Sequence, residues 1–525
     1  MSSFQVLAQT DEVSDFPRAF GSVVRADPDE TNFAGCVDVP QQVGHEDDRT
    51  IEYTDEHRLK PLILAVDESA EFGDTRLYLL GCDEWDECLV VNLYGVHGIG
   101  KGSGNVHSAK HGIAPEPFAI DPPQTFVSDC TMIPLFFPLF LPAMSTAFAS
   151  EHFRLGILGG GQLGRMLIQE CINLNVSTHV MDPDSNAPCR HLCDRFTHAD
   201  LMSDEDVYRF GKECSLLTVE IEHVNTHALE RLESEGVPVF PQPQLLRLVQ
   251  DKGLQKQFFV NHGIPTAPFV LINSREELAR MTAHLPAMLK LRKGGYDGKG
   301  VMKVRNSDEV ANAFDGPCVV EQLVDFRCEI SVIVARNIHG EISHFPAVDM
   351  EFNPEVNLVE FLCSPARIPQ EIAERAIAIA REVIGKMGMV GLLAVEMFVT
   401  THGEVLVNEI APRPHNSGHQ TIEGNVTSQY AQHLRSILGL PLGDTSCVRP
   451  AVMINLLGEP GHTGEAHYLG IDRVLDMPGV YVHLYGKKTT KPFRKMGHVT
   501  VTAENLEEAI ALARHVQGVL KVVTQ

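Results

Sequence analysis

Two glutamates, Glu396 and Glu409, have the spacing of a divalent metal site. They belong to the strand-like runs LLAVEMFVT and EVLVNEIAP, which partly alternate apolar and polar residues around a glycine-containing turn. If the loop consists of His402 and Gly403 alone, Glu396 lies directly opposite Glu409. Opposed like charges destabilise a sheet and oblige one carboxyl to keep its proton. Because Mg2+ takes one or two carboxylates together with substrate phosphates, the pair predicts a magnesium site; the alternative is a surface hairpin with two solvated glutamates.

A lysine and a glycine-rich loop could hold the phosphates that accompany such an ion. Lys290 lies on a predicted strand, and the loop 294–300, GGYDGKG, adds Lys299 and four glycines. No G-K-[ST] sequence opens a helix there, but glycine frees backbone N–H groups that can close over phosphates as a lid. A flexible hairpin tip is the alternative. The strand end Glu321–Val324, followed by Glu329, suits an adenine and its ribose hydroxyls.

A second glycine turn, LGGGQLGRM, follows an apolar strand and opens an amphipathic helix. Gly159, Gly161 and Gly164 satisfy G-x-G-x-x-G, and Asp182 ends a second strand. The motif predicts a tight turn whose helix N-terminus favours an anion. A dinucleotide would fit, and so would a sugar phosphate, which places a phosphorylated substrate near Gly161, Gln162 and Leu163.

Further polar residues follow predicted strands. Glu220 and Glu222 end the buried strand LLTVEIEHV, where either a site or a solvated strand end is possible, and Arg413, His415 and Asn416 follow Glu409 in a donor-rich loop. Near the C-terminus a basic cluster lies between two strands, where it could bind an anion or form a solvated hairpin. Its members are Lys487, Lys488, Lys491, Arg494, Lys495 and His498.

Composition excludes several classes of protein. The 525 residues carry a net charge of -26, which argues against a nucleic-acid partner. The 12 cysteines lack framework spacing and are expected to be reduced thiols in the cytoplasm. Residues 1–30 lack the apolar core of a leader peptide, and prolines interrupt the apolar run 132–148, so no membrane association is expected. We expect residues 1–150 to be a poorly ordered extension unrelated to the rest, with Met144 as a natural start.

The motifs from residue 153 onward resemble a known family. Lys290, GGYDGKG, Glu321–Val324, Glu329 and the Glu396/Asn408-Glu409 group are similar to the ATP-grasp family. Within it, LGGGQLGRM, EIAPRPHNSGH and YGK…RKMGH resemble the 5-(carboxyamino)imidazole ribonucleotide synthase family. The resemblance implies an α/β fold in three parts: a Rossmann-like pre-ATP-grasp domain, an ATP-grasp domain and a small C-terminal domain. The expected bounds are 151–251, 252–440 with a lid at about 265–325, and 441–525.

The resemblance also implies a reaction and a set of roles. ATP and bicarbonate would give carboxyphosphate, which delivers CO2 to the amine of 5-aminoimidazole ribonucleotide and leaves ADP and phosphate. The implied partners are these small molecules, a separate downstream mutase and a second copy of the chain in a homodimer. The residues implied to bind the metal are Glu396 and Glu409. The residues implied to bind ATP are Lys252, Lys290, Gly295, Tyr296, Asp297, Gly298, Lys299, Gly300, Val301, Glu321, Gln322, Leu323, Val324, Glu329, Asn408 and Glu409.

Other residues are implied to bind the ribonucleotide and bicarbonate. Tyr296, Asp297, Arg413, His415 and Asn416 would line their pocket, and either Glu220 or Glu222 would approach the amine. Lys487 and Arg494 would hold the ribonucleotide phosphate.

The chain departs from the family pattern at two positions. Phe352 stands where many relatives carry a His, and Phe493 stands where a Gly is usual, which puts the shape of that loop in doubt. Three other functions are weighed. Formate-dependent glycinamide ribonucleotide transformylase would show a DTGM-like sequence at 416–419, an NAD-binding oxidoreductase leaves the hairpin without a purpose, and a non-catalytic module would bind ATP without turnover.

Overall fold

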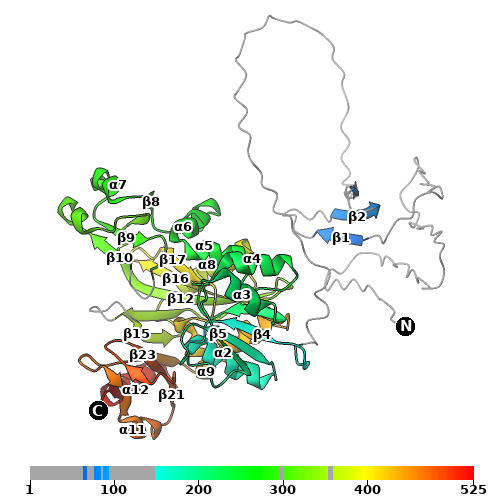
Figure 1. Ribbon diagram of the computed structural model, residues 1–525. Helices are drawn as coiled ribbons and strands as arrows, with labels where there is room; N and C mark the ends of the chain where they lie inside the picture. The colour runs from blue at the N-terminus through cyan, green and yellow to red at the C-terminus, as the bar shows by residue number, and fades with distance from the viewer. Residues whose placement is uncertain (1–62, 68–75, 84–86, 94–147, 296–299, 353–358) are drawn as a thin grey trace, which may run out of the picture. The chain divides into compact units, whose positions relative to one another are not determined.

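The computed structural model describes residues 63–67, 76–83, 87–93, 148–295, 300–352 and 359–525 (Figure 1). The chain divides into two compact units, Met1–Cys130 and Thr131–Gln525. In the first, an antiparallel sheet in the order β1-β2-β3 consists of Ile63–Asp67, Arg76–Asp83 and Glu87–Leu93. The rest of the expected N-terminal extension lies outside the described residues.

The second unit begins with a parallel sheet of order β6-β5-β4-β7. Its strands are β4 (Leu155–Leu158), β5 (Thr178–Asp182), β6 (Arg195–His198) and β7 (Leu216–Val219), and its helices are α2 (Gln162–Asn173), α3 (Asp204–Gly211) and α4 (Thr226–Ser234). Strands β4 and β7 are buried throughout and read as apolar runs, as parallel strands covered on both faces do. The alternation of strand and helix is the Rossmann-like arrangement predicted from the sequence.

An antiparallel four-stranded sheet of order β10-β9-β11-β8 follows. Helices α5 (Pro243–Gln250) and α6 (Lys252–Asn261) lead into it, and α7 (Arg275–Arg280) packs beside it. The strands are β8 (Phe269–Ile272), β9 (Ala287–Leu291), β10 (Val301–Val304) and β11 (Cys318–Gln322). The loop between β9 and β10 carries Tyr296, Asp297, Gly298 and Lys299, and these four lie outside the described residues.

One long sheet joins the middle of the chain to its C-terminus. Its order is β17-β16-β12-β14-β15-β18-β23-β21, with β13 also paired to β12. The pairing of β15 with β18 carries this sheet across the expected domain boundary at residue 440. The strands are β12 (Phe326–Arg336), β13 (Ile342–His344), β14 (Val348–Phe352), β15 (Val359–Ser364), β16 (Gly391–Thr400), β17 (Val405–Ala411), β18 (Ala451–Leu457), β21 (Val480–Leu484) and β23 (Lys495–Thr502).

Helices cover this sheet. Helix α8 (Gln370–Met387) packs its apolar stripe on β12, β16 and β17 and ends at Gly388, whose φ of 58° is the left-handed cap that glycine favours (Figure 1). The remaining elements are α9 (Thr421–Gly424), α10 (Gln429–Ile437), α11 (Ile471–Leu475), α12 (Leu506–Val519), β19 (Gly464–Glu465), β20 (His467–Leu469), β22 (Thr489–Thr490) and β24 (Lys521–Val523). Within the described residues no helix has the length and apolar character needed to cross a membrane.

The turn between β16 and β17 differs from the sequence prediction. Val399 pairs with Val405, and inside that pair the Thr400 N–H donates to the Glu404 carbonyl at 2.9 Å. The Gly403 N–H donates to the Thr400 carbonyl at 3.0 Å, so the loop is the three residues 401–403 rather than two. Gly403 has a φ of 82°, the left-handed conformation that closes three-residue hairpin loops. The two-residue loop expected from the sequence is therefore wrong.

Replacing Gly403 by alanine should destabilise the protein. A Cβ there meets only Ile372 Cδ1 at 3.7 Å, an ordinary contact, so the cost comes from the positive φ and should be about 1–2 kcal/mol in the free energy of unfolding. Denaturant unfolding measures it, with His402→Ala at the neighbouring exposed position as the control. Equal stability of the two variants would contradict the assigned backbone conformation.

Candidate active site

A β-bulge brings the two glutamates together. Glu396 pairs with Glu409, whereas the next residue, Met397, pairs with Val407, so Asn408 is the extra residue on its strand. A bulge of this kind re-aims the side chains beside it and is common near active sites. It also compensates for the longer loop, which is why the predicted opposition of Glu396 and Glu409 is confirmed although the predicted turn is wrong.

Charge is unevenly distributed over the pair. Burial, together with the negative charges of Glu409 and Glu329, raises the pKa of Glu396 to about 8. The ammonium of Lys252 forms an ion pair with Glu409 and lowers the pKa of that carboxyl. His415 Nε2 lies 3.5 Å from Glu396 Oε1. The site thus keeps one proton between two carboxylates, as the sequence predicted.

The donors at the bulge fit a hard divalent cation. Glu396 and Glu409 supply carboxylate oxygens, and the amide oxygen of Asn408, the extra residue of the bulge, accepts from Lys290 at 2.7 Å. In the described part of the chain no three His, Cys, Asp or Glu residues gather into a metal-binding group. Two carboxylates are a donor set that Mg2+ takes when water and phosphate oxygens complete its coordination.

A row of buried charges lies beside the pair. Glu321, on β11, is held between Lys256 Nζ at 2.9 Å and Lys290 Nζ at 2.7 Å, and its side chain is 4% exposed. Burial alone would raise the pKa of Glu321, but the two ammonium groups lower it. Lys290 also donates to Asn408 Oδ1 at 2.7 Å. The Glu321 carboxylate therefore faces the two lysines.

Glu329 lies on β12 within the same charged region. Burial, strengthened by the charge of Glu409 and opposed by Lys290, raises its pKa to about 7. Gln322 is the last residue of β11, and its N–H donates to Pro268 O at 2.9 Å; Leu323 and Val324 follow the strand.

The N-terminal glycine turn binds carboxylates of the protein itself. The Gly160 N–H donates to Asp182 Oδ2 at 2.6 Å, and the Leu163 N–H donates to Glu220 Oε1 at 3.1 Å. A Cβ on Gly161 would lie 2.4 Å from the same Glu220 oxygen, so a larger residue there would have to displace this carboxylate. Two N–H groups of the turn that carries Gly161, Gln162 and Leu163 are thus bonded to carboxylates of the protein itself.

The structure distinguishes the two glutamates that end β7. Glu220 lies under the glycine turn, where burial raises its pKa. Glu222 Oε1 lies 2.8 Å from Arg413 Nε, and its backbone carbonyl accepts from Gln250 Nε2 at 2.8 Å. Glu222 is therefore paired with Arg413, whereas Glu220 is bonded to the glycine turn.

The loop after β17 holds its polar groups firmly. The His415 N–H donates to Gln429 Oε1 at 2.8 Å, and His415 Nδ1 lies 3.0 Å from Ser417 Oγ. The amide nitrogen of Asn416 is buried and finds no acceptor among the described residues. A buried donor without a partner is costly unless a ligand supplies the acceptor.

The C-terminal basic cluster is only partly directed at the site. Arg494 Nη1 donates to Thr489 O at 2.8 Å and to its Oγ1 at 3.0 Å, whereas the positive charge of Lys495 acts on Glu396. Lys487 Nζ donates to Lys495 O at 2.7 Å. Phe493 has a φ of 62°, so it adopts the left-handed conformation for which glycine is the usual residue and keeps that backbone shape at some cost in strain.

Sequence reasoning missed Lys256 and favoured Arg494 over Lys495. The signal for Lys256 is its place four residues after Lys252, which puts both on one face of α6. Nothing in the local pattern separates Arg494 from Lys495, because both lie at the start of a strand in a loop rich in cations.

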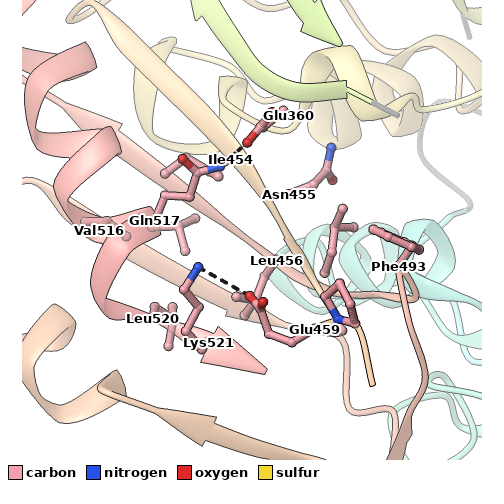
Figure 2. A pocket seen from close by; sticks show the side chains of 14 residues that line it. Glu360, Ile454, Asn455, Leu456, Glu459, Phe493, Val516, Gln517, Leu520 and Lys521 are labelled. Atoms are coloured by element: carbon pink, nitrogen blue, oxygen red, sulfur yellow. Dashed lines mark hydrogen bonds and ion pairs between the residues drawn. The ribbon is translucent and has the colours of Figure 1, made fainter. Parts of the chain in front are cut away.

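A cavity of about 260 Å3 lies apart from these residues, between β18, α12 and the loop of Phe493 (Figure 2). Its polar side chains are largely paired with one another: Gln517 donates to Glu360 Oε1 at 2.5 Å, and Lys521 lies 3.4 Å from Glu459. The charged row around Glu321, by contrast, encloses almost no free space. The charged side chains of the cavity are Glu360, Glu459 and Lys521, and each is paired with another residue that lines it.

Comparison with known proteins agrees with this geometry. The profile of the Ribonucleotide synthetase preATP-grasp domain matches residues 153–250, that of the ATP-grasp domain 257–430, and that of the Phosphoribosylaminoimidazole carboxylase C-terminal domain 451–512. N5-carboxyaminoimidazole ribonucleotide synthase of Bacillus subtilis is 36% identical over 68% of this chain and 93% of its own. The chain belongs to the N5-carboxyaminoimidazole ribonucleotide synthase family.

Solved structures of the family superpose on the same region. The synthetase of Thermotoga maritima is 39% identical, with a TM-score of 0.66 over 71% of this chain and 100% of that one. The Aspergillus clavatus synthase, solved with ADP and 5-aminoimidazole ribonucleotide, is 33% identical, with a TM-score of 0.64 over 70% and 97%. The predicted ATP-grasp fold with its pre-ATP-grasp and C-terminal domains is confirmed.

Some longer relatives are matched only in part. The chloroplastic phosphoribosylaminoimidazole carboxylase of Vigna aconitifolia is 38% identical over 67% of this chain, and this chain spans 64% of that protein. The match to the Saccharomyces cerevisiae carboxylase, at 34% identity, spans 66% of the yeast protein.

The raised pKa of Glu329 predicts a pH-dependent stability. Between its ordinary value of 4.5 and its folded value of about 7, the folded protein binds more protons at this carboxyl than the unfolded chain does. Its burial therefore costs nothing below that window, and the cost grows as the pH rises through it. Glu329→Gln should gain thermal stability relative to wild type at pH 8 but not at pH 4.5.

Melting temperatures at the two pH values measure this effect. Glu404→Gln, at an exposed position of the hairpin, is the matched control and should follow wild type at both values. A Glu329→Gln variant whose difference from wild type is the same at both pH values would refute the raised pKa.

Proposed function

We propose that the protein carboxylates 5-aminoimidazole ribonucleotide with bicarbonate at the expense of ATP, giving 5-(carboxyamino)imidazole ribonucleotide, ADP and phosphate. The observation that carries the proposal is the bulged hairpin, which sets Glu396 against Glu409 next to Lys252 and Lys290. Two carboxylates and two lysines at one point suit the triphosphate of ATP with its metal ion. The family match supports the choice of substrate, since the relative from Aspergillus clavatus was solved with that ribonucleotide.

The proposed first step is phosphoryl transfer. A bicarbonate oxygen attacks the γ-phosphorus of ATP, the bond to the β,γ-bridging oxygen breaks, and ADP leaves carboxyphosphate behind. Lys252, Lys290, Asn408 and Glu409 hold the nucleotide, with Glu329 at its ribose and the chain after Glu321 at its base. Mg2+, held by Glu396 and Glu409, would neutralise the phosphate charge that develops in this transfer.

The second step transfers CO2. Carboxyphosphate breaks into CO2 and phosphate, the exocyclic amine of the ribonucleotide attacks the carbon, and the nitrogen loses a proton. Arg413, held by Glu222, can bind the carboxyl group, and the unpartnered amide of Asn416 can donate to the substrate. We assign Glu220 to the amine, because its raised pKa and its place under the glycine turn suit a group that exchanges a proton.

The ribonucleotide phosphate is assigned to Lys487 and Arg494, and Lys495, whose positive charge acts on Glu396, is added as a further candidate. Gly161, Gln162 and Leu163 keep their proposed place beside the substrate, next to Glu220. Tyr296, Asp297 and the glycines around them keep their proposed role as a lid that excludes water from carboxyphosphate, which hydrolyses readily.

The remaining proposals rest on the family resemblance. We propose that the protein acts in the cytoplasm as a homodimer and that a mutase converts its product. Size-exclusion chromatography with light scattering tests the dimer directly.

The activity is tested by phosphate release from Mg-ATP and bicarbonate on the full chain. Release that depends on 5-aminoimidazole ribonucleotide is expected. Release stimulated instead by formate and glycinamide ribonucleotide would assign the chain to the transformylase reaction. ATP binding without release under either condition would leave a binding module.

Glu409→Ala should reduce ribonucleotide-dependent phosphate release to well below about a tenth of the wild-type rate, because the metal and Lys252 both lose their partner. The control is Glu404→Ala, five residues earlier and exposed, which should keep full activity. Circular dichroism should show both variants folded. Residual activity of Glu409→Ala above a tenth of wild type would reject the metal assignment.

A further inference from the structure

Lys256 is a buried lysine that the proposed chemistry does not use. It lies on α6 with its side chain 4% exposed, and its ammonium contacts Glu321 Oε1 at 2.9 Å and Thr266 Oγ1 at 2.7 Å. The carbonyl of Val407, beside the bulge, lies 3.5 Å away. Burial lowers the pKa of Lys256 to about 8, with Glu321 opposing that shift. Burying a charged group costs free energy, so we expect the Lys256 ammonium to have a role that offsets this cost.

The net charge of the groups around Glu321 suggests this role. One carboxylate compensates two ammonium groups, so Lys256, Glu321 and Lys290 together keep one positive charge. Lys290 alone of the two lysines reaches Asn408 at the edge of the nucleotide site, whereas Lys256 turns toward Thr266. The excess charge is therefore available at Lys290.

We propose that Lys256 is a positioning residue that holds Glu321 and so leaves the positive charge of Lys290 free to act on the phosphates of ATP. This inference rests on the proposed use of ATP. Without Lys256, Glu321 and Lys290 would form a neutral one-to-one pair, and the attraction for a polyphosphate would fall. A buried unit charge acts strongly on another charge nearby, because little water screens the pair.

The proposed role depends on the charge of the Lys256 side chain rather than on its shape, and the two can be tested separately. Lys256→Met keeps the length of the side chain and removes its charge, so ATP should bind about tenfold more weakly, while adenosine should bind as in wild type. The difference arises because adenosine carries no phosphate for Lys290 to attract. A purely structural Lys256 would lower the melting temperature without changing the ratio of the two affinities.

A compensating variant keeps the test informative if Lys256→Met folds poorly. In Lys256→Met/Glu321→Gln the excess positive charge returns to Lys290, so ATP affinity should recover to within about threefold of wild type. Lys303→Met, at an exposed position of β10 in the same sheet, is the matched control and should bind ATP as wild type does.

Titration calorimetry with Mg-ATP and with adenosine on the full chain gives both affinities. A tenfold loss specific to ATP, restored in the double variant, supports the proposal. Unchanged ATP binding in Lys256→Met, equal losses for ATP and adenosine, or a double variant that binds no better than the single one would each overturn it. Failure of wild type to bind ATP would instead overturn the proposed function, and this inference with it.

Discussion

Glu396 and Glu409 face each other across the β16–β17 ladder, where their like charges repel. The surrounding residues reduce that repulsion in different ways. Lys252 pairs with one carboxylate, burial keeps a proton on the other, and the bulge at Asn408 directs a third oxygen donor to the same place. The row through Lys290, Glu321 and Lys256 extends the same alternation of charge into the second sheet. The site thus alternates positive and negative side chains. A metal ion or a phosphate could bind there by replacing one of these side chains as the partner of an opposite charge.

Local pattern revealed the elements but not their exact register. Alternation and a glycine located the hairpin, yet the sequence does not show that Asn408 is an extra residue, because a bulge leaves the polarity of its neighbours unchanged. The glycine turn was recognised by its spacing, but which anion it binds depended on Glu220, which is distant in sequence. Lys256 was missed for a similar reason, since its partner Glu321 comes from another strand.

The sequence pattern also could not predict the contacts between the parts of the second unit. His433 on α10 accepts from the Leu392 N–H through Nδ1, so its Nε2 carries the proton donated to Thr218 Oγ1 at 2.9 Å. Burial lowers the pKa of His433 to about 4, so the ring stays neutral and keeps this tautomer. The His433 side chain thereby joins the β6-β5-β4-β7 sheet to β16, the strand that carries Glu396. The β15–β18 pairing joins the middle strands of the long sheet to its C-terminal strands.

The glycine turn has a consequence for selectivity. Its N–H groups are bonded to Asp182 and Glu220, so the turn carries built-in counter-anions. Helix N-termini of this kind otherwise attract any small anion in solution. Inorganic phosphate and sulfate would have to displace a covalently tethered carboxylate, whose effective concentration far exceeds theirs. We therefore expect the turn to respond less to small anions in solution than a helix N-terminus whose N–H groups lack such partners.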